Sequence, residues 1–184
     1  MRKLLTVMIA VSMIAVLVGC GSSEGNDKKA KFESAEDVLF QIYDSYEEDD
    51  KFPIAGGDSE NMSMDEPGEF DIDNTEELEA MLGFPISEVG SIDEAASMVH
   101  MMNANIFTCA SYHVVDGVDT DKFSEAVGEH ILDRQWICGM PDTLIIAEAG
   151  EYIVTSFGEA EIMDTFKANI TKLGMIVMEE ISIN

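Results

Sequence analysis

The segment TLIIAEAGEYIVTSF, residues 143–157, holds two short apolar runs that Gly150 and Glu151 separate. Branched apolar residues favour strands, and a glycine between two such runs favours a tight turn. We therefore expect residues 143–147 and 152–157 to form a β-hairpin. The rest of the fold is predicted outward from this pair.

A second hairpin is expected upstream. Residues 92–102 and 106–115 are apolar and partly β-branched, and three small or polar residues, 103–105, lie between them. Runs of this length with a short polar break are typical of paired strands. The chain thus holds two predicted hairpins of similar size.

A helical pattern follows each predicted hairpin. Asp119 or Thr120 begins the first helix, and we place His130 on its apolar face as a core or boundary histidine. Residues 159–173 form the second helix, whose last turn is followed by a glycine. The order ββαββα most simply gives an α+β fold, a four-stranded antiparallel sheet with helices packed on one face.

Further segments flank this unit. Residues 34–48 have the apolar spacing of an amphipathic helix behind a serine N-cap, and Thr75 is suited to cap a short helix that ends at Gly83. We assign residues 75–184 to one small α+β domain. Its tail, residues 175–184, fits both a helical extension and an edge strand.

Charge is the most unusual feature of the composition. The 184 residues include 37 acidic and 10 basic ones, which gives a formal net charge of −27. A nucleic-acid partner is disfavoured, because neutralising phosphates needs clustered Lys and Arg. The apolar content of 46% is enough for a folded core.

The first residues have the pattern of an export signal. Arg2 and Lys3 precede an uncharged, largely apolar run over residues 4–18, which as a helix would span about 22 Å against a hydrocarbon core of roughly 30 Å. We therefore expect residues 1–19 to be a signal peptide rather than a membrane span. The sequence Leu-Val-Gly-Cys that ends at Cys20 is similar to a bacterial lipobox.

Lipidation of Cys20 would locate the protein. In a lipobox the cysteine thiol accepts diacylglycerol before the signal peptide is removed, and two or three acyl chains are enough for stable anchoring. We expect a cell-membrane lipoprotein that faces the outside of the cytoplasm. Residues 20–33 would be the lipidated cysteine and a flexible, polar tether.

Acidic residues concentrate upstream of the predicted domain. Residues 33–79 hold 18 acids and one base, Lys51, and residues 49–74 also contain two prolines and a Gly-Gly pair. We predict an acidic, mobile loop over residues 49–74. Acid runs of this kind are usually solvated.

A calcium site in that loop is the alternative, since hard cations take oxygen ligands. The candidate carboxylates are Asp65, Glu66, Glu69, Asp71 and Asp73. An EF-hand that started at residue 71 would need glycine at position 76 and glutamate at position 82, and these positions hold glutamate and leucine. Asp71 and Asp73 remain the candidate ligands.

A copper site is a second metal hypothesis. Met98, His100 and Met102 alternate, so a strand would place them on one face, with His113 on the partner strand. Thioether and imidazole ligands suit copper(I). Methionines also fill gaps in ordinary cores, which is the preferred interpretation.

The thiols other than Cys20 are Cys109 and Cys138. Outside the cytosol such a pair can form one disulfide. A buried free thiol at Cys109, in the middle of a predicted strand, is the alternative, and the sequence leaves both open.

Catalytic motifs are missing from the sequence. It has three histidines to serve as bases, and no nucleophile elbow, phosphate loop or zinc-protease helix. We therefore predict a non-enzymatic protein without a cofactor. A contact with a partner is expected around Trp136, Met140 and Pro141, because tryptophan and methionine are enriched at interfaces; the alternative is that Trp136 fills the core under a turn.

Residues 75–174 resemble the family known as domain of unknown function 4358, uncharacterised lipoproteins of anaerobic Gram-positive bacteria. The resemblance rests on the lipobox at Cys20, the helix end Asp133-Arg134-Gln135-Trp136, the turn Met140-Pro141-Asp142, the hairpin at residues 150–154 and the helix around Phe166. It implies an envelope location and an α+β fold, and an anaerobic lifestyle would favour free thiols. It implies no activity.

Together these patterns predict a membrane-anchored, extracytoplasmic lipoprotein that binds or supports a partner at the cell envelope. Its expected partners are the lipid bilayer, through Cys20, and an envelope protein or small ligand. The alternative is a solute- or metal-binding accessory protein of a transporter, although about a hundred ordered residues are few for a two-lobed solute receptor.

Overall fold

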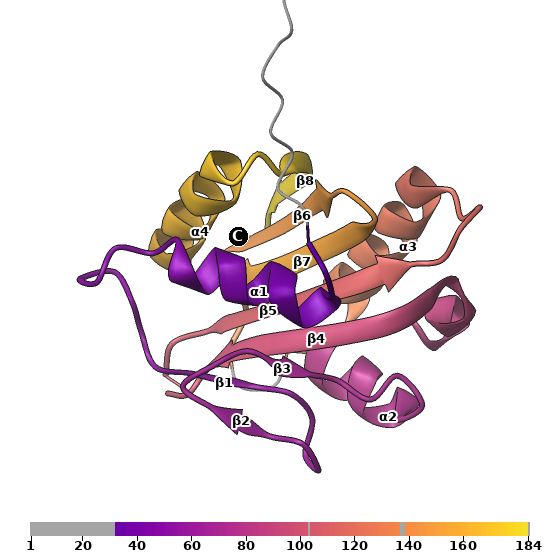
Figure 1. Ribbon diagram of the computed structural model, residues 1–184, viewed down its shortest axis with the longest axis horizontal. Helices are drawn as coiled ribbons and strands as arrows, with labels where there is room; N and C mark the ends of the chain where they lie inside the picture. Colours follow the sequence, from indigo (N-terminus) through magenta and orange to yellow (C-terminus); the bar gives the residue numbers. More distant parts are fainter. Residues whose placement is uncertain (1–31, 103, 137–138, 184) are drawn as a thin grey trace, which may run out of the picture.

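The computed structural model describes residues 32–102, 104–136 and 139–183. These residues build one antiparallel sheet of eight strands in the order β2-β1-β4-β5-β7-β6-β8, with β3 paired to β4 (Figure 1). The strands are β1 (Ile54–Gly56), β2 (Ser63–Met64), β3 (Gly68–Glu69), β4 (Ile92–His100), β5 (Phe107–Val114), β6 (Thr143–Ala149), β7 (Tyr152–Gly158) and β8 (Ile176–Ser182).

Both predicted hairpins are present. Strand β4 pairs with β5, and β6 pairs with β7 around the turn at residues 150–151. Strands β5 and β7 join the two hairpins, with Cys109 opposite Ser156. The mixed class and the antiparallel sheet are therefore confirmed, and the expected number of four strands is wrong, because residues 54–69 and 176–182 add four more.

The segment predicted as an acidic loop, residues 49–74, contains strands β1, β2 and β3. Asp58 organises it: its side chain is 2% exposed and accepts the backbone N–H groups of Glu60, Asn61 and Asp71. Burial alone would raise the pKa of Asp58, but these hydrogen bonds outweigh burial and lower it. One buried carboxylate thus binds backbone groups up to 13 residues farther along the chain.

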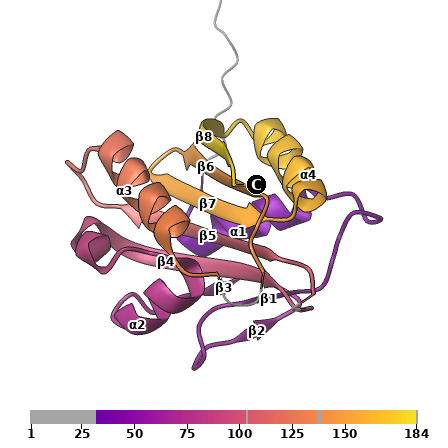
Figure 2. The ribbon, with the colours of Figure 1, turned by 180° about the vertical axis from the view of Figure 1, so that it is seen from behind.

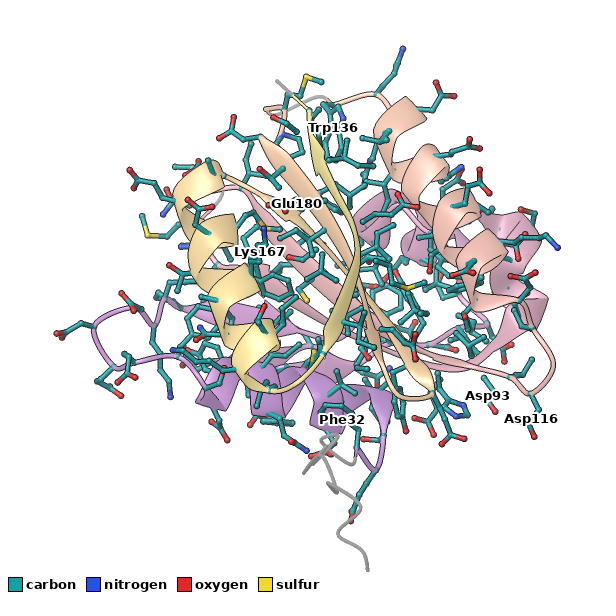
Figure 3. The ribbon with its side chains drawn as sticks, turned by 90° about the horizontal axis from the view of Figure 1, so that it is seen from above. Phe32, Asp93, Asp116, Trp136, Lys167 and Glu180 are labelled. Atoms are coloured by element: carbon teal, nitrogen blue, oxygen red, sulfur yellow. The ribbon has the colours of Figure 1, made fainter. Side chains whose placement is uncertain are left out.

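The C-terminal tail is an edge strand rather than a helical extension. Strand β8 pairs antiparallel with β6, with an irregularity between Ile146 and Ala147. Glu180 on this strand forms an ion pair with Lys167 of the neighbouring helix, and Figure 3 shows the two side chains close together.

Helices cover both faces of the sheet, so the prediction of helices on one face is wrong. Helices α1 (Ala35–Asp44) and α4 (Ala160–Lys172) pack on one face. Helix α3 (Thr120–Asp133) packs on the other, with the short helical segments α2 (Thr75–Glu77), η1 (Leu78–Leu82) and η2 (Ile86–Ser91) on the same side (Figures 1 and 2).

Successive residues of the central strands explain the two layers. Cys109 and Val154 belong to the core beneath α1 and α4, whereas their chain neighbours Ala110 and Ile153 belong to the core beneath α3. Because successive side chains of a strand point to opposite faces, a run that is apolar throughout needs cover on both sides. Figure 3, seen from above, shows α4 and α3 on either side of the strands.

The helix ends follow local chemistry. The side chains of Ser34 and Asp119 cap α1 and α3 as expected. The cap of α2 is Asn74 rather than the predicted Thr75, since the Asn74 side chain accepts the N–H of Glu77. The core also extends upstream of residue 75, because three side chains of α1 are fully buried: Val38, Leu39 and Ile42.

Candidate functional site

A pocket of about 450 Å³ lies where the end of α3, segment η1 and the β4–β5 turn meet. We call it the Trp136 pocket, and Figure 3 shows Trp136 at the end of the sheet opposite to Asp93 and Asp116. Its lining combines apolar and polar side chains: Met81, Val99, His100, Asn105, Ile106, Phe107, Thr108, Arg134, Gln135, Trp136, Gly139 and Phe157.

Arg134 is positioned by the end of α3. Its guanidinium lies 4.8 Å from the ring centre of Trp136 and 5.8 Å from that of Phe157, and its Nη2 donates to the carbonyl oxygen of Ala80 at 2.7 Å. The side chain also crosses close to Gly83, where a Cβ would lie 3.1 Å from Nη1. The arginine therefore links α3 to the C-terminal end of η1, where a cation is favourable.

Arg134 has few partners for a cation in so acidic a chain. Within the described residues it forms no salt bridge, and the Ala80 carbonyl is its only hydrogen-bond acceptor. Burial lowers the pKa of Arg134, and the charge of Glu79 acts in the opposite direction. The guanidinium remains charged and has five N–H groups. Since the described residues supply it with one acceptor, the carbonyl of Ala80, it retains unused donors.

Trp136 forms the aromatic wall of the pocket. Its ring packs edge-on against Phe157, with 5.2 Å between ring centres. Its indole N–H, like Nη1 of Arg134, is covered and has no hydrogen-bond acceptor among the described residues. Buried donors are usually paired, so two unpaired ones in a single lining are notable.

His100 lies at the other side of the pocket. Its ring stacks on Phe52 at 4.8 Å between centres, and its Nδ1 accepts the backbone N–H of Met102 at 3.0 Å. The neutral ring therefore carries its proton on Nε2, which lies 3.2 Å from the side-chain amide of Asn105. The structure places Nδ2 of Asn105 at this distance, so with that tautomer the amide must turn over for its oxygen to accept the proton of His100.

The three residues expected at a partner contact differ in their exposure to solvent. Trp136 lines the pocket and is half-buried, and Met140 is 48% exposed next to the lining residue Gly139. Pro141 is buried. Sequence reasoning missed Arg134, although the signal was available, since it is the only arginine after Arg2 and precedes the only tryptophan by two residues.

Among the calcium candidates, Asp71 takes part in local hydrogen bonds with both its side chain and its backbone. The carboxylate of Asp71 accepts the N–H of Asp73, and the N–H of Asp71 donates to Asp58. Nearby, Glu36, Glu69, Asp71, Asp93 and Glu94 line a hollow of about 310 Å³. Burial raises the pKa of Glu36, and the charges of Glu69 and Glu66 add to this shift.

The copper candidates are not brought together. Met98 lies in the core under α1 and α4, and Met102 is 57% exposed. His113 pairs with Glu94 in the sheet, far along the strand from His100, and its side chain contacts Asp93. The described parts of the chain contain no group of three or more His, Cys, Asp or Glu side chains arranged to hold a metal ion.

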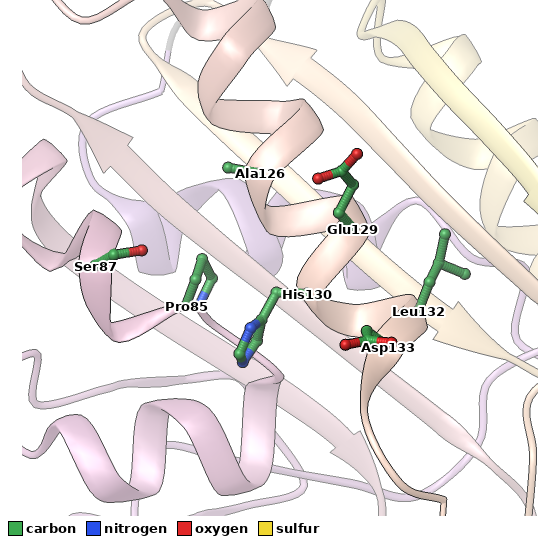
Figure 4. A pocket seen from close by; sticks show the side chains of 7 residues that line it. All are labelled: Pro85, Ser87, Ala126, Glu129, His130, Leu132 and Asp133. Carbon is green, nitrogen blue, oxygen red and sulfur yellow. The ribbon is translucent and has the colours of Figure 1, made fainter.

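His130, predicted as a core or boundary histidine, is partly buried next to the buried Ile131. Its side chain is 36% exposed, and its Nε2 lies 3.5 Å from a carboxylate oxygen of Glu79. It lines a shallow hollow of about 630 Å³ between α3 and the segment 85–87, which we call the α3 hollow (Figure 4). The buried apolar face of α3 is formed by Phe123, Val127 and Ile131.

Cys109 is a buried free thiol, and burial raises its pKa. Cys138, its candidate disulfide partner, and Cys20, with the signal peptide and most of the tether, lie outside the described residues. None of the helices in the described ranges is both long enough and apolar enough to cross a membrane.

Comparisons of the sequence with protein-family models and curated proteins, and of the structure with solved structures, found no match.

The pH response of the pocket follows from His100. Burial lowers the pKa of His100, while the charge of Glu159 opposes this. The unfolded chain, with a histidine pKa of about 6.5, therefore takes up the proton first as the pH falls. The stabilisation by neutral His100 is complete above pH ~6.5 and declines as the pH falls toward the lower folded-state pKa.

We predict that His100→Asn and His100→Phe flatten the decline in the free energy of unfolding between pH 8 and pH 5, measured by urea titration. His100→Phe keeps the stack on Phe52 but loses the acceptor for Met102, which should cost about 1 kcal/mol at pH 8. If both variants decline as steeply as wild type, the proton uptake at His100 does not control this stability.

Proposed function

We propose that the chain is an extracytoplasmic lipoprotein, anchored through Cys20, that acts as a non-enzymatic binding module. Its ligand site is the Trp136 pocket. The observation that carries this proposal is a half-buried tryptophan beside an arginine that has no carboxylate partner among the described residues, both in the lining of one pocket.

The form of the pocket supports a small ligand. Its volume of about 450 Å³ lies within the range of small-molecule sites, which are mostly apolar with a few placed polar groups. Phe107, Ile106 and Phe157 supply apolar surface, while Arg134 and Asn105 supply donors. The alternative function, a solute-binding accessory protein of a transporter, would use the same pocket.

The anchor rests on sequence alone. A charged start, an apolar run too short to span a bilayer and a lipobox that ends at Cys20 together favour export and lipidation. The acidic composition would keep the domain away from anionic headgroups and in solvent.

We predict that Cys20→Ala abolishes incorporation of a labelled palmitate analogue when the full chain is expressed in a bacterium that processes lipoproteins. Cys138→Ala is the matched control and should label like wild type. Equal labelling of the Cys20→Ala variant would show that the anchor is absent or lies elsewhere.

The pocket can be tested through its own tryptophan, the only one in the chain. We predict that small aromatic fragments change the fluorescence of Trp136 in the mature chain carrying Cys20→Ser, and that Val99→Phe, which fills the pocket, weakens this binding tenfold or more. Ala126→Phe fills the α3 hollow instead and should leave the binding unchanged. Fragments that bind equally to both variants would place the site elsewhere.

A further inference from the structure

We propose that the Trp136 pocket selects ligands that join a planar apolar group to a carboxylate. This inference rests on the proposed binding function and adds the chemical class of the ligand. It follows from what Arg134 contacts and from what surrounds it.

Arg134 differs from the other cations in the described ranges. Lys122 pairs with Asp119, and Lys167 pairs with Glu180. Lys172 donates to the side chain of Asn169, and Lys51 lies over the ring of Tyr43. Arg134 lines a pocket, yet no carboxylate of the described residues forms an ion pair with it, although the chain has 37 acids.

A bound carboxylate would supply what Arg134 lacks. A guanidinium has five N–H donors in a planar fork that matches the two oxygens of a carboxylate. The described residues accept one hydrogen bond from it, at the carbonyl of Ala80. Nη1 and the indole N–H of Trp136 are also unpaired, although a ligand oxygen would have to displace covering side-chain atoms to reach them.

The surroundings of Arg134 select the other half of the ligand. The guanidinium lies over the rings of Trp136 and Phe157, and Ile106 and Phe107 extend the apolar lining. A planar apolar group can pack on the half-buried ring of Trp136 while its acid reaches the guanidinium. On the polar side, the lining also holds the side-chain amide of Asn105, next to Nε2 of His100.

The net charge of the whole chain favours the opposite kind of ligand from the one proposed. A formal charge of −27 attracts cations and repels anions at long range. A preference for anions can therefore come only from local groups of the pocket. If the long-range field decided binding, the order of affinities would be reversed.

The test compares three probes of similar size: phenylacetate, phenylacetamide and phenethylamine. Binding to the mature chain carrying Cys20→Ser is followed by the fluorescence of Trp136 and by the shift in melting temperature. We expect phenylacetate to bind about tenfold more tightly than phenylacetamide, since charge-assisted hydrogen bonds are about twice as strong as neutral ones. Phenethylamine should bind most weakly.

The Arg134→Gln variant should bind phenylacetate and phenylacetamide with equal affinity, because the cation that distinguishes the acid from the amide is removed. Lys122→Gln removes an exposed cation and should keep the wild-type preference. If Arg134→Gln does not fold, salt gives a second measurement. At about 1 M, where the screening length is about 3 Å, the long-range field of the chain is screened, so a preference for the acid that comes from direct contact with Arg134 should persist, and its loss would contradict that contact.

The outcomes separate the two proposals. Equal binding of acid and amide by the wild type overturns the carboxylate inference and leaves the pocket as a binding site. Tightest binding of phenethylamine also overturns it, because the long-range field would then decide. Binding of none of the three overturns the inference, whereas the fragment test with Val99→Phe decides on the pocket itself.

Discussion

Strands β4, β5, β7 and β6 carry buried side chains on both faces, and the rest of the structure depends on covering the two faces at once. Helices α1 and α4 cover one of them, and α3 with η1 covers the other. Because the covering elements come from both sides of the hairpins in the sequence, the domain needs nearly all of the described chain. Burial on this scale is the main driving force for folding.

The pocket is a consequence of this layered arrangement. Helix α3 ends near one end of the central strands, and the chain continues from its last turn into Arg134 and Trp136. The β4–β5 turn and the end of η1 lie at the same end of these strands. Arg134 bridges 54 residues of sequence to reach Ala80, so the site exists only when both hairpins and η1 are in place. The hydrogen bond to Ala80 and the contacts with Trp136 and Phe157, which come from distant parts of the chain, therefore hold Arg134 in place.

Elements with a repeating local pattern were predictable from the sequence. Both hairpins and helices α1, α3 and α4 follow from apolar spacing, caps and glycines. Strands β1 to β3 are two or three residues long, so they carry no period, and they depend on the buried carboxylate of Asp58. The second helical layer was missed even though residues 143–147 and 152–157 are nearly continuous apolar runs, which indicate strands buried on both faces.

The candidate site was predicted in part. Trp136 was identified as a lone tryptophan in a turn, but its partners Arg134, His100 and Asn105 are brought together by long-range packing that no local spacing shows. The copper candidates are close in sequence, and alternation places Met98 and His100 on one face of β4. Met102 lies beyond the end of that strand, however, and the register places His113 opposite Glu94.

The most direct test of two-sided cover compares residues 32–184 with residues 75–184, which lack α1 and strands β1 to β3. Val38, Leu39 and Ile42 alone stabilise the fold by about 1.5–3 kcal/mol each, a large part of the usual 5–15 kcal/mol. Urea unfolding, followed by the fluorescence of Trp136, should show one cooperative transition for residues 32–184 and none for residues 75–184. A cooperative transition at the same midpoint in both would contradict the account.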